Sequence, residues 1–259
     1  MTYRFDDGQA GYNPIEAVQP VPATTPPNPF WSPGFIAVAE DPVWGPGEFV
    51  FGRVGANIRP YGLCSCLPVW DAANKIFTYN FVEALATALS GRSLYVLQGN
   101  VGGVAGATVA ASAGQYAWFQ MSGRSPVNGT ATVAADTTAG HNATGQLTAL
   151  VASLQVVNAR VITPATQTVV AAQTGLGAIG DTQIQLASIA GFFPGVYVSG
   201  TGVGAAAICT AVDQVSRIIQ VSVVNSAQVS GNVTATYNNA AIFYNVLEMN
   251  RMFAQGAIT

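Results

Sequence analysis

The residue best suited to chemistry is His141, the only histidine in the chain. It lies in the run 139–145, which is rich in Gly, Asn and Thr. A hydrolytic triad needs a nucleophile and a carboxylate beside the imidazole. No G-x-S-x-G motif occurs in the chain, and the nearest acid in sequence is Asp136. We therefore expect His141 to be a turn or interface residue and the protein not to be an enzyme.

Paired carboxylates and clustered cysteines are the other candidates for chemistry, in glycoside hydrolysis or metal binding. The adjacent acids Asp6-Asp7 and Glu40-Asp41 lack the oxygen donors at alternate positions that calcium loops supply. Cys64 and Cys66 lie two residues apart, with Cys209 far away, so the second pair of a zinc site is missing. We expect solvated loop carboxylates, buried thiols, no metal and no cofactor.

Tryptophans offer a third kind of site, because their rings can form a platform for a sugar. Aromatic residues at strand ends more commonly fill a core or an interface, so carbohydrate binding is kept as an alternative. The four residues concerned are Trp31, Trp44, Trp70 and Trp118.

Charge is scarce in this chain: only 8% of residues are charged, against about 25% in a typical soluble domain. A free monomer normally needs more surface charge to stay dispersed, so we expect a subunit of an assembly that also self-associates. The net charge of −3 and the single lysine, Lys75, predict no nucleic-acid partner. No run of about 18 apolar residues is uninterrupted, so we expect no membrane span.

Residues 1–33 predict an extended N-terminal arm, because seven prolines in this segment disfavour helices and central strands. A disordered tail is the alternative, but disordered segments are poor in aromatic residues. We expect the arm to lie on a neighbouring subunit and to make the capsid or intersubunit contact through five aromatic residues. These are Tyr3, Phe5, Tyr12, Phe30 and Trp31.

The stretch 114–147 appears as the centre of the main domain. Runs 116–121 and 130–135 are typical of strands, and Asn128-Gly129 between them predicts a tight turn. Upstream, Asn80 and Glu83 could cap a short helix over 81–89. The run 147–161 fits one strand, two strands or a helix. The C-terminal run 242–253 fits both strand alternation and helical spacing, and we favour a strand that closes the domain.

Composition shifts between 163 and 237, where six short alternating runs separated by turn residues indicate a small all-β module. We therefore predict an all-β protein: a β-sandwich or distorted barrel over 34–162 plus 238–259, with an inserted β module at 163–237 and the N-terminal arm at 1–33. We expect the inserted module to be removable without unfolding the rest.

The order of motifs resembles that of the small capsid decoration, or cement, proteins of tailed bacteriophages. The chain has G-x-Y-x-W-F-Q-M-x-G at 114–123, ATVAA at 131–135 and AGHNATGQL at 139–147. Those proteins often carry a G-x-Y/F-x-W-x-Q-x-x-G run, a VAAG-type strand and an A-T-x-G-x-L run. The resemblance covers about residues 35–150. Asp136 stands where the family often has glycine, and the long arm is a further departure.

The inserted module has G-D-T-x-I-x-L at 180–186 and V-S-G-T-G-V at 198–203, and it resembles β modules appended to phage structural proteins. The resemblance implies a structural virion protein on the outer surface of the capsid, which binds the major capsid protein lattice and stabilises the shell. The alternative is a head fibre or tail protein that binds a receptor or a host-surface glycan.

Overall fold

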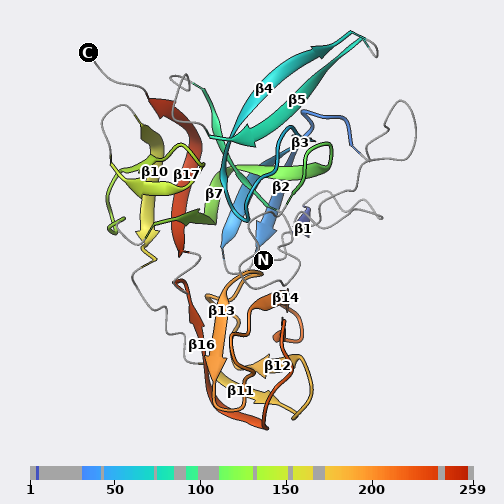
Figure 1. Ribbon diagram of the computed structural model, residues 1–259, viewed down its shortest axis with the longest axis vertical. Helices are drawn as coiled ribbons and strands as arrows, with labels where there is room; N and C mark the ends of the chain where they lie inside the picture. Colours follow the sequence, from blue (N-terminus) through green and yellow to red (C-terminus); the bar gives the residue numbers. More distant parts are fainter. Residues whose placement is uncertain are drawn as a thin grey trace.

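The computed structural model contains strands and no helix in the part of the chain that it describes (Figure 1). The described residues are 4–5, 31–41, 44–72, 75–84, 92–98, 111–130, 133–150, 154–165, 173–238 and 243–255. The strands form two curled sheets, one of them a half-barrel. The predicted all-β fold, a sandwich or distorted barrel, is therefore confirmed.

In chain order the strands are β1 (Arg4–Phe5), β2 (Ile36–Asp41), β3 (Gly45–Val54), β4 (Leu63–Asp71), β5 (Ile76–Glu83), β6 (Leu94–Leu97), β7 (Tyr116–Gly129), β8 (Ala139–His141), β9 (Leu147–Ala149), β10 (Gln155–Thr163), β11 (Gln173–Gly177), β12 (Gln183–Leu186), β13 (Tyr197–Gly200), β14 (Cys209–Asp213), β15 (Ile218–Val221), β16 (Val229–Thr236) and β17 (Phe243–Gln255).

The eleven-stranded sheet, which contains β1 to β10 and β17, closes on itself twice, and both closures use β7. One circuit of paired strands runs β3-β5-β4-β6-β7 and returns to β3. The other runs β7-β17-β10-β8-β9 and returns to β7. Strand β7, which forms the first part of the stretch 114–147, is thus the strand shared by the two circuits.

Strand β7 can belong to both circuits because it changes partner half-way along. Residues 116–122 pair with β3, and residues 122–129 pair with β17. The register against β3 shifts between Gln120 and Ser122. Gly123 follows with a φ of +95°, a backbone conformation that glycine alone adopts without steric cost. The strand is redirected there, as at a β-bulge.

The hairpin predicted within this stretch is wrong. Strand β7 runs through Asn128 and Gly129, which pair with Tyr244 and Phe243 of β17 instead of forming a turn. Of the second predicted strand, the described residues 130 and 133–135 lie outside any strand. The backbone N of Asn128 also donates a hydrogen bond to the carbonyl oxygen of Tyr61 at 2.8 Å. These tertiary contacts outweigh the local preference of both residues for a turn.

A small separate core lies within the first circuit. Every strand of the circuit contributes a buried side chain to it, including Val50, Cys64, Phe81, Leu97 and Phe119. The rings of Phe81 and Phe119 are stacked with their centroids 3.8 Å apart. Because all five strands supply apolar groups, this core holds the closed circuit together.

The helix predicted over 81–89 is wrong for residues 81–83, which belong to β5; residues 85–90 lie outside the described residues. Glu83 is not part of a capping box. Its Oε1 accepts hydrogen bonds from the backbone N and the Nε of Arg59, at 2.9 and 2.8 Å. Stacking of Phe81 and pairing of Glu83 outweigh a weak local helix signal.

The run 147–161, which the sequence left open, forms parts of two strands, β9 and β10. The C-terminal strand is confirmed as β17, which lies between β7 and β10 and closes the second circuit. Its partners are therefore far away in the sequence, and the domain is completed only when the last described strand is in place.

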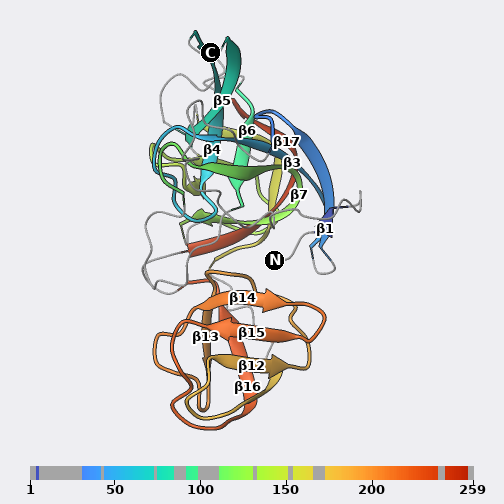
Figure 2. The ribbon, with the colours of Figure 1, turned by 90° about the vertical axis from the view of Figure 1, so that its right-hand side faces the viewer.

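The six-stranded sheet has the order β13-β16-β11-β12-β15-β14 and takes up residues 173–236 (Figures 1 and 2). Its strands alternate as the sequence predicted. In β12, Ile184 and Leu186 are buried whereas Gln183 and Gln185 are exposed. One face of the sheet therefore covers a core and the other faces outward.

The two sheets meet at Phe193, which lies in the loop between β12 and β13 and is fully buried. Its ring makes edge contacts with Tyr61 and Tyr244 of the eleven-stranded sheet region, at centroid distances of 5.7 and 5.2 Å. Trp44 and Tyr237 complete this junction at 6.3 and 5.3 Å. The two sheets consequently share one continuous hydrophobic core.

Candidate functional site

The five aromatic residues predicted to contact another subunit are only partly within the described structure. Tyr3, Tyr12 and Phe30 lie outside the described residues. Phe5 lies in β1, which pairs with β2 of its own chain. Trp31 is half-buried and stacks on Phe35 with a centroid distance of 4.7 Å. An intersubunit role for these residues stays a prediction.

The candidate catalytic groups are not brought together. His141 lies buried in strand β8 rather than in a turn. Burial lowers the pKa of its ring, which favours the neutral imidazole at pH 7. Asp136 is exposed and lies 3.8 Å from Arg160 instead. Among the described residues, no three His, Cys, Asp or Glu side chains are close enough to hold a metal ion.

The expectation that Glu40 and Asp41 are solvated loop carboxylates is wrong for Asp41, because both residues lie in strand β2 and their side chains point to opposite faces. Glu40 is exposed, whereas Asp41 is fully buried. Asp41 Oδ1 accepts a hydrogen bond from the backbone N of Trp44 at 2.9 Å, and Oδ2 accepts one from Gln214 Nε2 at 2.7 Å. Since Gln214 belongs to the six-stranded sheet region, Asp41 links the two sheets.

The three cysteines are free thiols in apolar surroundings. Burial raises the pKa of the Cys66 thiol to about 11 and that of Cys209 to about 12. The pKa of Cys64 is also raised by burial. The thiolate is the nucleophile and the metal ligand, so the folded chain offers no reactive sulfur at these positions.

The native thiols should therefore react at least 100-fold more slowly with an aromatic disulfide reagent at pH 8 than the thiols of the unfolded chain. An unperturbed cysteine has a pKa of about 8.5, so roughly a quarter is thiolate at pH 8, against about a thousandth for a pKa of 11. Absorbance of the released thiolate, with and without denaturant, measures the ratio. Rapid reaction of one thiol in the native protein would contradict this picture of burial.

The tryptophans do not form one platform. Trp118 is buried in the core, and Trp31 packs over it at 6.2 Å. Trp44 packs on Phe193 at the junction. Trp70 is 51% exposed on β4. It pairs with Phe77 of β5 and has no ring contact with another tryptophan in the described structure. A sugar site built from several tryptophan rings is not present among the described residues.

Trp70 belongs to a two-stranded projection that Figure 1 shows extending beyond the rest of the sheet, which we call the β4–β5 ribbon (residues 66–71 and 76–79). Near its base β4 pairs with β6 as far as Ser65, and β5 pairs with β3 from Asn80 onward. Within the described chain, the ribbon strands pair only with each other. A two-stranded ribbon is at best marginally stable alone in water.

One face of the ribbon is entirely apolar. Pro68 pairs with Tyr79 and Trp70 pairs with Phe77, so these four side chains lie on the same face. All four are exposed, with Phe77 at 60% and Trp70 at 51%. The rings of Trp70 and Phe77 meet edge to face at 5.0 Å. We call this surface the apolar ribbon face.

Charged side chains gather on a different surface, across the middle of β7, β17 and β10. Arg124 and Arg160 lie directly opposite Glu248 on the neighbouring strands. Arg160 Nη2 is 2.8 Å from Glu248 and Arg124 Nη2 is 3.5 Å from it. Arg160 holds the pKa of the Glu248 carboxyl below its usual range, chiefly by hydrogen bonding. Exposed pairs of this kind contribute little stability but keep the surface hydrated.

Arg251 and Glu48 extend this charged surface with a two-bond contact. Arg251 donates from Nε and Nη2 to the two carboxylate oxygens of Glu48, at 3.0 and 2.9 Å. The hydrogen bond from Arg251 lowers the pKa of Glu48. Together with Asp136, the surface carries three arginines and three carboxylates, which compensate each other.

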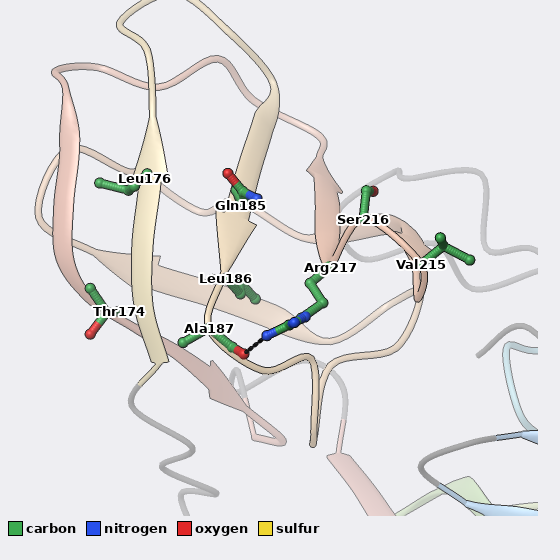
Figure 3. Close-up of a pocket in the computed structure, with 8 residues that line it drawn as sticks. All are labelled: Thr174, Leu176, Gln185, Leu186, Ala187, Val215, Ser216 and Arg217. Carbon is green, nitrogen blue, oxygen red and sulfur yellow. Dashed lines mark hydrogen bonds between the residues drawn. The ribbon is translucent and has the colours of Figure 1, made fainter.

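The outward face of the six-stranded sheet carries a concavity of about 610 Å³ (Figure 3). Three segments line it: β11, the end of β12, and the turn between β14 and β15. Arg217 reaches across it, and its Nη1 donates a hydrogen bond to the carbonyl oxygen of Ala187 at 2.9 Å. Leu176 and Val215 stand beside it as exposed aliphatic side chains. We call this site the β11–β12 concavity.

The comparisons add no relative to these observations: no family model, curated protein or solved structure matches the chain. The described residues also contain no helix that is long and apolar enough to cross a membrane.

Proposed function

We propose that this protein is a non-enzymatic structural subunit of a tailed-bacteriophage head, which sits on the outer surface of the capsid and binds the lattice of the major capsid protein. It stabilises the shell by mass action, because a subunit that binds only the assembled lattice adds its binding free energy to that assembly. We also propose that it forms a homo-oligomer.

The observation that carries this proposal is the apolar ribbon face. Clustered aromatic residues that protrude and are exposed typically mark a protein interface. The side chains of Trp70, Phe77 and Tyr79 lie on a two-stranded projection. Such a projection is marginally stable alone, so a partner that covers it would stabilise it. The described part of the β4–β5 ribbon is therefore suited to contact another protein rather than solvent.

The size of the apolar ribbon face indicates how it is used. Aromatic side chains bury about 150–250 Å² each, so its half-exposed residues offer on the order of 300–400 Å². A stable interface needs about 800 Å² per partner, so flat contact through this face alone is too small. Insertion of the β4–β5 ribbon into a groove covers both faces and the open strand edges, and capsid lattices provide grooves between neighbouring subunits.

The charged surface supports the same arrangement. Glu48, Arg124, Arg160, Glu248 and Arg251 form pairs among themselves, so they need no charged partner. A surface of this kind is compatible with a solvent-facing side of the bound subunit. In this proposal the chain is polarised, with an apolar projection toward the capsid and a compensated charged surface exposed to water.

The double substitution Trp70→Ser and Phe77→Ser should weaken binding to purified capsids at least 100-fold, since buried aromatic anchors dominate interface energies. Both side chains are exposed, so the free protein should keep its fold. Co-sedimentation with capsids that lack the protein measures the affinity, and circular dichroism checks the fold.

The matched control is Ile179→Ser with Val224→Ser, which removes two other exposed apolar side chains, at 69% and 51% exposure, from the six-stranded sheet region. This control should bind capsids as the native protein does. Unchanged binding of the ribbon variant, or equal loss in the control, would refute the role of the ribbon. If the ribbon variant loses self-association but keeps capsid binding, the ribbon joins copies of this chain instead.

A further inference from the structure

We propose that the β11–β12 concavity binds a carboxylate-bearing sugar residue and that Arg217 holds the sugar carboxylate. This recognition function goes beyond capsid attachment and uses a different sheet from the apolar ribbon face. It gives the six-stranded sheet a role of its own on the outside of the particle.

Arg217 is positioned as an anion anchor. Its Nη1 bond to the Ala187 carbonyl fixes the guanidinium across the concavity. It forms no ion pair with any carboxylate in the described part of the chain. A guanidinium has five N–H donors in a planar fork, and only one of them is used by the bond to Ala187 in the described structure. This fork matches the two oxygens of a carboxylate.

Asp213 lies in the same turn but forms no ion pair with Arg217. Asp213 Oδ2 accepts a hydrogen bond from Ser216 Oγ at 2.6 Å, and Oδ1 accepts one from the backbone N of Val215 at 2.9 Å. These bonds also fix the turn that carries Arg217. The positive charge in the concavity therefore lacks a carboxylate partner among the described residues and sits on a well-defined loop.

The backbone of Arg217 adds a second argument. Its φ is +56°, a left-handed conformation in which residues other than glycine are disfavoured. Glycine would be accommodated there with less strain, yet the position carries a long cationic side chain that points into a concavity. Strain of this kind is commonly retained where the side chain has a function.

The remaining lining suits a sugar ring. Gln185 and Thr174 provide an amide and a hydroxyl that form no side-chain hydrogen bond within the described structure, and such groups recognise sugar hydroxyls. Leu176 and Val215, 59% and 77% exposed, supply apolar surface for the C–H groups of the ring. The volume of about 610 Å³ falls in the range of small-molecule sites.

A carboxylate fits better than a phosphate or sulfate group. Arg217 is the single cationic residue that lines the concavity, and phosphate sites usually combine several cationic or backbone donors. One fork-shaped donor with neutral polar and apolar neighbours matches a singly charged acid on a mostly neutral ring. Uronic acids and nonulosonic acids have this chemistry.

The test is a titration of the full-length protein with galacturonic, glucuronic and N-acetylneuraminic acids, followed by isothermal calorimetry or by NMR. Galactose and glucose are the neutral counterparts of the two uronic acids. We expect saturable binding of at least one acidic sugar, with a uronic acid bound at least ten-fold more tightly than its neutral counterpart. Arg217→Gln should lower the affinity at least ten-fold, and Arg53→Gln, which removes another exposed arginine, should leave it unchanged.

A second variant guards against loss of folding. Arg217→Gly relieves the left-handed backbone, so its Tm should not fall, while acidic-sugar binding should be lost. The proposal is overturned if none of the three acids binds, if the neutral sugars bind equally well, or if Arg53→Gln causes the same loss. Equal competition by acetate would show a general anion site and would also overturn it. Two further measurements keep this test separate from the proposed capsid role. Arg217→Gln should bind capsids as the native protein does, and the ribbon variant should bind the acidic sugar as the native protein does.

Discussion

Replacing Phe193 by alanine should lower the free energy of unfolding by about 3–5 kcal/mol, the usual cost of truncating a buried phenylalanine. Phe193 is fully buried, and its ring touches aromatic residues from both sheets. The cavity left behind would lie between Tyr61, Tyr244 and Tyr237. These rings belong to different sheet regions, so neither sheet can collapse into the space without leaving the other.

The substitution should also separate the unfolding of the two sheets. In the native chain the shared core couples them, so denaturant unfolding should follow one transition. In Phe193→Ala the transitions should split, which tryptophan fluorescence and far-ultraviolet circular dichroism can detect as curves that no longer coincide. Trp44 lies 6.3 Å from Phe193 and reports directly on the junction.

The control is Phe192→Ala, which truncates the neighbouring buried phenylalanine. No ring contact ties Phe192 to Tyr61 or Tyr244 in the described structure, so this variant should destabilise the six-stranded sheet while the native coupling remains. A loss below about 1 kcal/mol in Phe193→Ala, with one intact transition, would contradict a junction that couples the sheets.

The contacts of Phe193 also bear on the prediction that residues 163–237 form a removable module. The sequence showed a change of composition over this segment, but it could not show which loop of the module reaches the other sheet. Replacing the module with a short link removes Phe193 and the Gln214 bond to Asp41 together. We therefore expect the shortened chain to have a lower free energy of unfolding than it would have if the module were joined to the rest only through surface loops.

The sequence predicted strands well where alternation was regular. The buried and exposed positions of β12 follow the period of two. The run that forms β17 fitted helical spacing as well, so its sequence favoured a strand without deciding it. Successive side chains of a strand point to opposite faces of the sheet, so alternating apolar and polar residues indicate which face is buried. The all-β class and the central place of the stretch 114–147 followed from such local patterns.

Sequence reasoning failed where distant pairing decides the structure. Asn128-Gly129 has strong turn preference, but β17, more than a hundred residues later, pairs with it. The helix signal at Asn80 and Glu83 lost to the stacking of Phe81 on Phe119. Local preferences are worth about 1 kcal/mol or less per residue, which tertiary contacts readily exceed.

The candidate sites were hidden for the same reason. Trp70 and Phe77 form one apolar face only because their strands pair in a particular register. The β11–β12 concavity joins three segments that are separate in sequence, including Thr174, Gln185 and Arg217. The signal that could have indicated the ribbon is the pair of runs LPVW (67–70) and IFTY (76–79) on either side of a polar segment. Both runs are uncharged and nearly continuous in apolar residues.

Replacing Gly123 by alanine should strongly destabilise the fold. A Cβ atom at Gly123 would collide with the carbonyl oxygen of Pro46 and would lie 3.0 Å from the Cα of Gly47. Both are backbone atoms of β3, so the clash cannot be relieved by a side-chain rotation. β7 and β3 would have to separate at the point where β7 passes from one circuit to the other.

A matched control separates this clash from the cost of the backbone conformation. Gly45 has a φ of +79°, similar to the +95° of Gly123, but a Cβ atom there would meet nothing within 4 Å. Gly45→Ala should therefore cost only the left-handed conformation, about 1–2 kcal/mol. Gly123→Ala should cost about 4 kcal/mol or more, or prevent folding, because an overpacked backbone contact adds to that strain. Denaturant unfolding of both variants measures the difference. Equal costs for the two substitutions would mean that β3 does not hold β7 at its bend and that the two circuits are not joined there.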